Sequence, residues 1–237
     1  MIYAVVGPTG VGKTKLSIML AKKLNAVILN CDSMQIYKEL NIGTAKIKED
    51  EKEEIPHYLF DIVSIKDDYN AFNYQKDGRK LLDKFIKGNK NIIIVGGTGL
   101  YLKALLYDYN FNDKESSNKK IYDFKIIGLK RDRDKLYDSI NKRVDIMIEE
   151  GLVDEAKELY TSFKTSRALN FAIGYKELFS YFNGDKTLEN AILDIKQASR
   201  RYAKRQFTFF NNQFDNITWY DIDNISFEEI INQTIKD

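Results

Sequence analysis

The most constraining feature of the sequence is a glycine-rich segment that begins at residue 7. It matches the phosphate-binding pattern G-x-x-x-x-G-K-[ST], and it lies between a β-branched run at 2–6 and an amphipathic stretch at 13–24. In such a strand–loop–helix unit, the loop N–H groups and the helix N-terminus bind phosphate oxygens, and the Lys and Thr add a charge and a ligand for Mg²⁺. The residues are Gly7, Pro8, Thr9, Gly10, Val11, Gly12, Lys13 and Thr14. The segment predicts a bound phosphate group without specifying which one.

Strand and helix patterns alternate after this loop. Apolar runs at 26–30, 91–95 and 124–129 predict strands, and helical spacing is found at 72–85 and 101–106. Further helical patterns occur at 136–148, 153–163, 175–182 and 188–210, and the polar run at 112–120 predicts a mobile surface loop. We therefore expect an α/β fold: a P-loop NTPase-like parallel sheet with helices on both faces and a mostly helical C-terminal half, with residues 1–237 forming a single domain.

The length and the cysteine content of the chain bear on how its core is stabilised and on the compartment in which we expect the protein. The 237 residues suffice for a buried core without disulfides or a structural metal. The single cysteine, Cys31, follows an apolar run and is predicted to be a buried residue without a catalytic role. The N-terminal apolar run stops at Gly7, so we expect neither a signal peptide nor a membrane span. These features predict a cytoplasmic protein, which we expect to be a monomer that does not engage a membrane.

The residues after the run at 91–95 argue against an ordinary kinase or nucleoside triphosphatase. Such enzymes usually place a Mg²⁺-binding acid at the end of a strand beside the phosphate loop. Here the run is followed by Gly96, Gly97 and Thr98. The glycines allow a ligand or another backbone to approach closely. Thr98 either offers its hydroxyl to the site or caps the next helix.

A second polar group follows the run at 26–30. The carboxyl ends of parallel strands line one crevice, so Asp32 should face the ligand of the phosphate loop; the alternative is a turn residue. Ser33, Met34 and Gln35 come next. Because an amide side chain such as that of Gln35 can pair bidentately with adenine, this group favours recognition of a base.

A basic run without acidic residues lies in the last long helical pattern. It contains Lys196, Arg200, Arg201, Lys204 and Arg205. On a helix, Arg200 with Lys204 and Arg201 with Arg205 form two adjacent rows that can follow a phosphate backbone. The alternative is a solvated face. The net charge of +2 does not decide between the two.

Nine sequence blocks occur together and in order, and together they resemble the tRNA dimethylallyltransferase family. They extend from the phosphate loop to the last long helix, with sequences such as GPTGVGKT, DSMQIY, IGTAK, GGTGLY, RVD, GLVDE, AIGYKE and YAKRQ. Each block alone is weakly specific. Their positions are 7–14, 32–37, 42–46, 56–61, 96–101, 143–147, 151–155, 172–177 and 202–206.

The resemblance implies a reaction in which the exocyclic amine of an adenine beside the anticodon attacks C1 of dimethylallyl diphosphate and releases pyrophosphate. It implies that Lys13, Thr14 and Mg²⁺ neutralise the leaving pyrophosphate and that Arg143 clamps it. Asp32 would accept the proton of the amine. Thr98 would lie between the two substrates. His57, the sole histidine, is not expected to be the base, because Asp32 has that role.

The resemblance also implies contacts with the anticodon stem-loop of tRNA. The residues expected there are Asp32, Ser33, Met34, Gln35, Ile173, Gly174, Tyr175, Lys176, Arg200, Arg201, Lys204 and Arg205. For Lys204 the alternative is a position that faces the pyrophosphate.

The sequence departs from the family in one large feature and two small ones. Family members usually carry a helical insertion before the strand at 124–129, and only the short remnant at 103–123 fills that space here. Tyr58 stands where a second histidine is common, and Phe209 where tryptophan is frequent. Three alternatives therefore stay open: an adenylate isopentenyltransferase that acts on free AMP, a small-molecule kinase that uses ATP, and a non-catalytic RNA-binding module.

Overall fold

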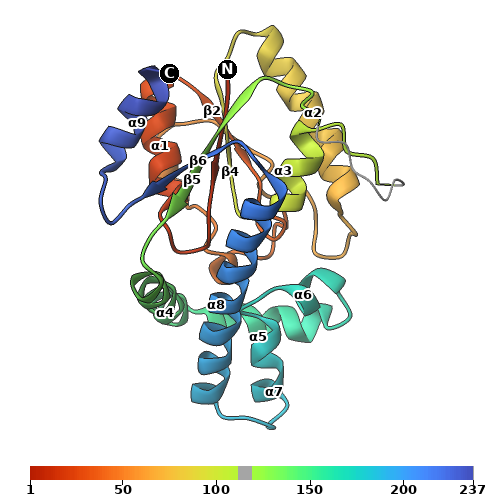
Figure 1. The fold of residues 1–237 in the computed structure, drawn as a ribbon. Coiled ribbons are helices and arrows are strands. Elements are labelled where there is room, and N and C mark those ends of the chain that lie inside the picture. The colour runs from red at the N-terminus through yellow and green to blue at the C-terminus, as the bar shows by residue number, and fades with distance from the viewer. Residues whose placement is uncertain (112–118, 237) are drawn as a thin grey trace.

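The structure, a computed structural model, describes residues 1–111 and 119–236. The loop predicted at 112–120 therefore lies mostly outside the described residues. Within them, a six-stranded parallel sheet has the order β3-β2-β4-β1-β5-β6 (Figure 1). The strands are β1 (Ile2–Val6), β2 (Val27–Asn30), β3 (His57–Tyr58), β4 (Ile92–Val95), β5 (Phe124–Lys130) and β6 (Ile217–Asp221).

The strand that precedes the phosphate loop lies inside the sheet. Ile2 of β1 pairs with Ile92 of β4 on one side and with Phe124 of β5 on the other, and all five residues of β1 are buried. Branched apolar side chains fill both sides of such a strand, which explains its uninterrupted apolar sequence. Because all strands are parallel, the loops that follow β1, β2 and β4 converge at one edge of the sheet.

Helices cover both faces of the sheet (Figure 1). On one face, α1 and α9 pack against the strands through Leu16, Leu20 and Ile230. On the other face, α2, α3 and the end of α8 pack through Tyr74, Leu102 and Phe210. The bounds of these helices are α1 (Lys13–Leu24), α2 (Ala71–Lys87), α3 (Gly99–Leu106), α8 (Leu188–Gln213) and α9 (Phe227–Lys236).

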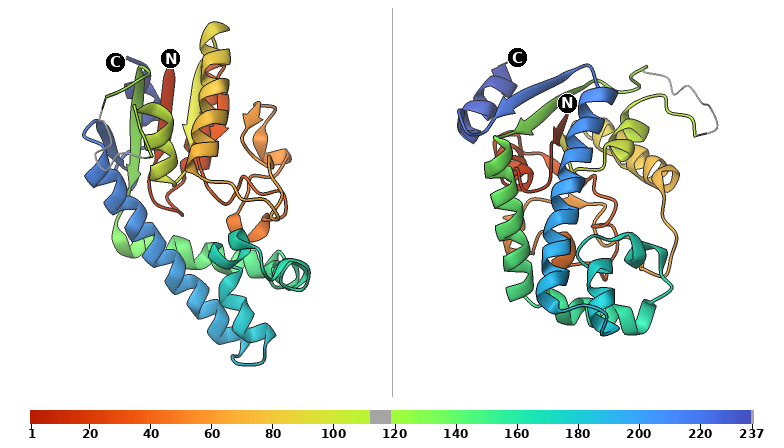
Figure 2. Two further views of the ribbon diagram at one scale, coloured as in Figure 1. Left: turned by 90° about the vertical axis from the view of Figure 1, so that its right-hand side faces the viewer. Right: turned by 60° about the horizontal axis from the view of Figure 1, so that its bottom comes forward.

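A separate group of helices lies below the carboxyl ends of the strands. Figures 1 and 2 show that α8 runs through this group and continues up to the sheet, so it belongs to both parts. Leu152, Leu169, Tyr175 and Ile195 are among the buried residues that form the core of this part. It comprises α4 (Arg133–Glu149), α5 (Leu152–Phe163), α6 (Arg167–Phe171), α7 (Phe179–Phe182) and the 3-10 turns Ile42–Thr44 and Lys176–Leu178. A further 3-10 turn is Asp50–Lys52.

The predicted fold class is confirmed: a parallel sheet with helices on both faces and a largely helical C-terminal half. The helix predicted at 175–182 is instead a 3-10 turn followed by the short α7, and it starts after Gly174, which has a φ of +98°. The edge strands β3 and β6 and the helices α6 and α9 were not predicted. None of the helices formed by residues 1–111 and 119–236 has the length and apolar character needed to cross a membrane.

Truncating Phe210, which is 1% exposed where α8 meets the sheet, should destabilise the protein markedly. We expect Phe210→Ala to lower the free energy of unfolding by about 3–5 kcal/mol, because the cavity left under α8 cannot collapse fully. Leu193→Ala on the same helix, at a side chain that is 60% exposed, is the control and should cost less than about 0.5 kcal/mol. Chemical denaturation measures both, and equal losses would contradict this account of how α8 is held.

Candidate active site

The phosphate loop has the backbone geometry that its glycines predict. Gly7, Gly10 and Gly12 have φ values of +142°, +80° and +93°, a region that other residues rarely adopt. A Cβ on Gly7 would lie 2.5 Å from the carbonyl oxygen of Leu129, so β5 leaves no room for a side chain there. Gly12 is the N-cap residue of α1, and no side-chain hydrogen bond caps this end. The first-turn N–H groups of α1 are thus oriented for an anion.

Lys13 lies across the loop from which it arises. Its Nζ donates to the carbonyl oxygens of Gly7 at 3.0 Å and Pro8 at 2.8 Å. Desolvation and, to a smaller extent, the positive charge of Arg143 lower the pKa of Lys13 to about 7, whereas Asp32 opposes the shift. An anion bound beside Lys13 would restore its charge.

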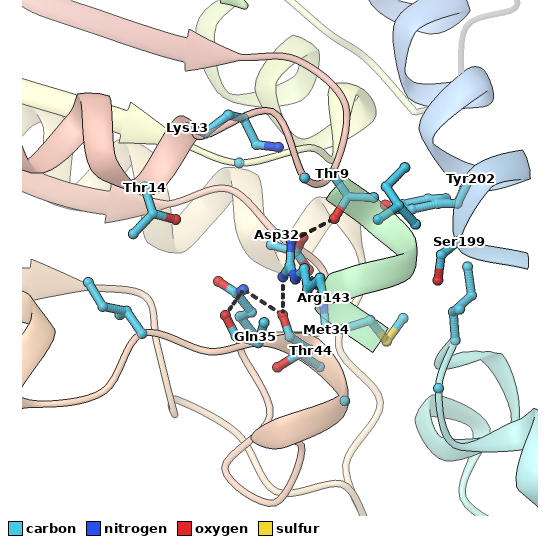
Figure 3. Close-up of a pocket in the computed structure, with 18 of the residues that line it drawn as sticks. Thr9, Lys13, Thr14, Asp32, Met34, Gln35, Thr44, Arg143, Ser199 and Tyr202 are labelled. Atoms are coloured by element: carbon cyan, nitrogen blue, oxygen red, sulfur yellow. Dashed lines mark hydrogen bonds between the residues drawn. The ribbon is translucent and has the colours of Figure 1, made fainter. Parts of the chain in front are cut away.

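Thr14 is exposed to the same cavity as Lys13 (Figure 3). Among the described residues, no group of three or more His, Cys, Asp or Glu side chains is arranged to hold a metal ion. Mg²⁺ is commonly held by one or two protein oxygens together with the phosphates of the substrate. The Thr14 hydroxyl at the start of α1 fits a site of this kind, in which the phosphates of the substrate supply further ligands.

Arg143 connects α4 with two distant segments of the chain. Nη1 donates to Oγ1 of Thr9 at 2.8 Å, and Nη2 donates to the carbonyl oxygen of Thr44 at 3.2 Å (Figure 3). Burial lowers the pKa of the Arg143 guanidinium, and the charge of Asp32 opposes this shift. Arg143 therefore lies beside the phosphate loop, and its expected contact with a leaving pyrophosphate stays a prediction.

Asp32 is held in place by a buried asparagine. Asn30, the last residue of β2, accepts from the backbone N–H of Asp32 at 3.0 Å and donates to its carbonyl oxygen at 3.1 Å. The carboxylate Oδ1 of Asp32 accepts from the N–H of Met34 at 2.9 Å, so Asp32 also forms the turn given as its alternative role. Asp32 lines the cavity and is close enough to shift the pKa of both Lys13 and Arg143.

Thr98 lies behind the Asp32 segment. Its hydroxyl accepts from the N–H of Ser33 at 3.0 Å and donates to the hydroxyl of Ser33 at 3.3 Å. Thr98 is the N-cap residue of α3 but makes no side-chain capping bond, so the alternative of a simple capping side chain is wrong. Cys31 is buried, and desolvation raises the pKa of its thiol to about 12, as expected for a structural residue.

The cavity between the sheet and the lower helices has a volume of about 560 Å³. The phosphate loop, the Asp32 segment and the turn at 42–44 line one side, and α4 and α8 line the other. Gln35 forms part of the wall, with its Nε2 donating to the carbonyl oxygens of Thr44 and Ala45. The apolar side chains that face the cavity include Met34, Ile140, Val144, Met147, Ile173 and Ile195. The cavity thus combines a phosphate site with an apolar compartment.

Residues 173–176, which were expected to contact tRNA, lie in different environments in the structure. Ile173 and Gly174 line the cavity. Tyr175 is fully buried; its hydroxyl donates to Glu155 at 2.5 Å and accepts from the N–H of Gly43 at 3.1 Å. Tyr175 therefore positions the turn at 42–44 and offers no surface to RNA, which corrects the expectation. Lys176 is exposed and is not among the cavity-lining residues.

His57 lines the cavity from β3. Its Nδ1 donates to the carbonyl oxygen of Ile55 at 2.7 Å, and burial lowers its pKa below the ordinary value. The ring is thus fixed by the backbone beside it, and the assignment of the base to Asp32 rather than to His57 stays a prediction.

The basic run of α8 divides between two faces. Arg200 donates to Asn141 of α4 at 2.6 Å, and Lys196 pairs with Asp145 of α4. Arg201, Lys204 and Arg205 are exposed. The predicted row of Arg200 and Lys204 is therefore not a uniform surface. Lys204 and Arg205 border a shallow hollow next to Phe209, which packs against Gly99.

Tyr202 and Gln206 line the cavity from α8 and had no predicted role, as is also true of Ile195 and Ser199. Tyr202 points from α8 across the cavity (Figure 3). Burial raises the pKa of Tyr202 and the charge of Asp32 adds to this, whereas hydrogen bonds with the side chains of Thr98 and Gln206 oppose it. Their spacing of four residues puts both on one helical face, but spacing cannot tell which neighbour that face meets.

The chain is similar in sequence to one group of known proteins. The model of a family described as IPP transferase matches residues 35–121 and 110–213. The tRNA dimethylallyltransferase of Anoxybacillus flavithermus is 39% identical, with 99% of this chain and 94% of the relative covered. That of Bacillus subtilis is 38% identical, with 93% and 90% covered. The first alignment extends over 296 positions against 237 residues here, so at least 59 of its positions have no counterpart in this chain.

Two solved structures of similar proteins superpose closely on this chain. The tRNA delta(2)-isopentenylpyrophosphate transferase of Staphylococcus epidermidis superposes with a TM-score of 0.91 at 34% identity, covering 99% of this chain and 97% of the other. The full-length tRNA isopentenylpyrophosphate transferase of Bacillus halodurans gives a TM-score of 0.91 at 36% identity, covering 99% and 94%. Both similarities extend over nearly the whole chain.

The lowered pKa of Lys13 predicts that anion binding depends on pH. Above pH 7, Lys13 in the free protein is mostly neutral, and a bound pyrophosphate favours its charged form. Binding above pH 7 should therefore take up a proton at Lys13, and the affinity should fall as the pH rises, by up to about tenfold per unit. Calorimetry with Mg²⁺ and pyrophosphate in buffers of different ionisation enthalpy measures this uptake. Lys13→Met is the control and should lack it; the same uptake in both proteins would contradict the assignment.

Proposed function

The chain belongs to the IPP transferase family, and on that premise we propose that it transfers a dimethylallyl group from dimethylallyl diphosphate to the N6 amine of the adenine beside the anticodon in tRNA. The observation that carries this proposal is one cavity in which the phosphate loop, Arg143 and Asp32 meet beside an apolar compartment. A prenyl diphosphate needs both a phosphate site and an apolar site. An attacking amine needs a carboxylate within reach.

The diphosphate would bind where the first turn of α1 begins. The loop N–H groups and Lys13 would hold its oxygens, and Arg143 would add a two-pronged cationic contact from α4. Mg²⁺ would bind the diphosphate and the Thr14 hydroxyl and would neutralise charge on the leaving group. These groups act on the charge that develops as the C1–O bond breaks, and stabilising such charge is commonly the largest contribution to catalysis.

Asp32 would act on the other substrate. The adenine amine forms the new bond to C1, pyrophosphate leaves, and the carboxylate of Asp32 accepts the proton that the amine loses. The buried Asn30 fixes the backbone of Asp32, and the turn to Met34 fixes one carboxylate oxygen. The carboxylate is thereby oriented before the base arrives.

The base would be read by the segment that follows Asp32. Both hydrogens of the Gln35 amide already meet carbonyl oxygens, so we expect its oxygen, rather than its NH₂, to face the adenine. Ser33 and Met34 line the same wall, and Ile173 and Gly174 lie in the wall formed after α6. Thr98 would contribute by holding Ser33 in place.

The alternative interpretations, an enzyme that acts on free AMP and a kinase, have less support. The relatives and solved structures that match nearly the whole chain carry names of tRNA enzymes, which favours tRNA over free AMP. A kinase would need an acid after β4, where Gly96 stands instead. We expect the protein to act as a monomer in the cytoplasm, where tRNA is found and where a thiol such as that of Cys31 stays reduced.

We further propose that the connection between α3 and β5 replaces a larger insertion. The two matches to the family model overlap at 110–121, and the alignment with the Anoxybacillus relative has at least 59 unmatched positions. Tyr107 and Lys120 form an antiparallel bridge that brings the two ends of the connection together. Arg79 of α2 donates to the carbonyl oxygens of Ala104, Leu105 and Tyr107 and closes the end of α3. The grip on tRNA would then depend on the exposed cations of α8.

The first test of this function is the fate of a labelled prenyl group. The protein, Mg²⁺ and labelled dimethylallyl diphosphate are incubated with bulk tRNA or with AMP, and label in tRNA is expected. Asp32→Asn should lower kcat by about 10²–10⁴-fold and leave pyrophosphate binding within about twofold, because a base makes no contact with the leaving group. Label in AMP alone, or a near-normal kcat in Asp32→Asn, would contradict the proposal.

The second test concerns the exposed cations of α8. We expect Arg201→Ala with Arg205→Ala to weaken tRNA binding and to reduce the salt slope by about 0.7–0.9 per lost phosphate contact. The control is Lys23→Ala with Lys90→Ala, two exposed residues at the opposite, amino-terminal edge of the sheet. Titrations at two salt concentrations compare the pairs. Equal slopes in both double variants would mean that this face of α8 does not follow the RNA backbone.

A further inference from the structure

A single buried side chain joins α8 to the phosphate loop. Gln206 is 5% exposed; its Oε1 accepts from the backbone N–H of Thr9 at 2.8 Å, and its Nε2 donates to the carbonyl oxygen of Gly97 at 3.0 Å. A Cβ on Gly97 would lie 1.9 Å from Nε2 of Gln206, so the glycine leaves the space that the amide fills. One amide thus connects the loop after β1 with the loop after β4.

Thr9 is held from two sides by this arrangement. Gln206 takes its backbone N–H, and Arg143 donates to its hydroxyl at 2.8 Å. The same guanidinium donates to the carbonyl oxygen of Thr44 in the turn at 42–44. The position of Thr9 therefore determines where Nη1 of Arg143 lies, and Gln206 in turn determines the position of Thr9.

The bond to Gln206 also changes what Thr9 can do. Its N–H is already satisfied within the protein, so it is not one of the loop amides that bind the anion, in contrast to those at the start of α1. What Thr9 presents to the cavity is its hydroxyl, directed toward Arg143 (Figure 3). At this end of the loop, the contact to a leaving diphosphate therefore comes from side chains whose placement Gln206 determines.

We propose that Gln206 is a positioning residue for prenyl transfer: it orients Thr9 and, through Thr9, the Arg143 guanidinium toward the departing diphosphate. The inference rests on the proposed function. No proton moves at Gln206, which only donates and accepts fixed hydrogen bonds. Its effect should appear when the C1–O bond breaks, because a small misplacement of a group that stabilises the developing charge can cost about 10²-fold in rate.

The first measurement is Gln206→Leu, which keeps the approximate size of the side chain and removes its hydrogen bonds to Thr9 and Gly97, together with the one to Tyr202. We expect kcat to fall about 10–100-fold, with little change in KM for tRNA. The matched control is Gln75→Leu in α2, another buried glutamine, whose amide donates to the carbonyl oxygens of Ala104 and Tyr109 and does not line the cavity. Both variants should lower Tm to a similar extent, whereas only Gln206→Leu should lose kcat. Equal losses of kcat in the two variants would overturn the inference, because they would indicate a general loss of packing.

The second measurement asks whether Gln206 acts through Thr9. Thr9→Val removes the hydroxyl that Arg143 contacts and keeps the backbone N–H. In that background Gln206→Leu should cost much less in kcat than it does in the wild type, because interacting residues are not additive. Full additivity would overturn the inference.

The same cycle applied to the Kd of inorganic pyrophosphate with Mg²⁺ separates this inference from the proposed function. If the wild type labels neither tRNA nor AMP, the proposed function fails, and the binding cycle still tests the link between Gln206 and Thr9. A coupled effect on Kd supports the link. Independent effects on Kd refute it, whatever the acceptor substrate is.

Discussion

Two basic side chains, Lys13 and Arg143, are held in one cavity, close enough for the charge of Arg143 to lower the pKa of Lys13. The positive charge of Arg143 adds to the desolvation that lowers the pKa of Lys13 to about 7, and Asp32 only partly opposes it. The fold maintains this unfavourable arrangement with backbone carbonyls around Lys13 and with Thr9 and Thr44 around Arg143. A multivalent anion relieves it, and so the site favours such an anion over a neutral ligand.

The arrangement requires parts of the chain that lie far apart in sequence. Lys13 comes from the first loop, whereas Arg143 comes from α4, which lies below the sheet. The long α8 joins the two parts: Ile195 packs in the lower core and Phe210 against the sheet. Gln206 lies between them and contacts the phosphate loop. The relative position of the two parts is thus set by α8 together with the contacts of Arg143.

Local patterns were sufficient to predict the framework. The interior strands and the long amphipathic helices have apolar sequences of distinct period, and the phosphate loop has fixed backbone requirements. The edge strands β3 and β6 were missed because β3 has only two residues and Ile217–Asp221 mixes exposed and buried positions. The cavity was harder to predict. Asp32 and Arg143 were found by motif, but no pattern could show that Tyr175 faces Glu155 or that Gln206 meets Thr9, because such contacts depend on how helices pack.

The bridge between Tyr107 and Lys120 has a consequence for how the architecture can change. Because the two ends of this connection lie side by side, the chain between them can lengthen or shorten while α3 and β5 keep their places. The entropic cost of closing a loop grows only slowly with its length, so the thermodynamic cost of a longer connection at this point is small. The bridge therefore marks a position at which the length of the chain can change without displacing the residues that line the cavity.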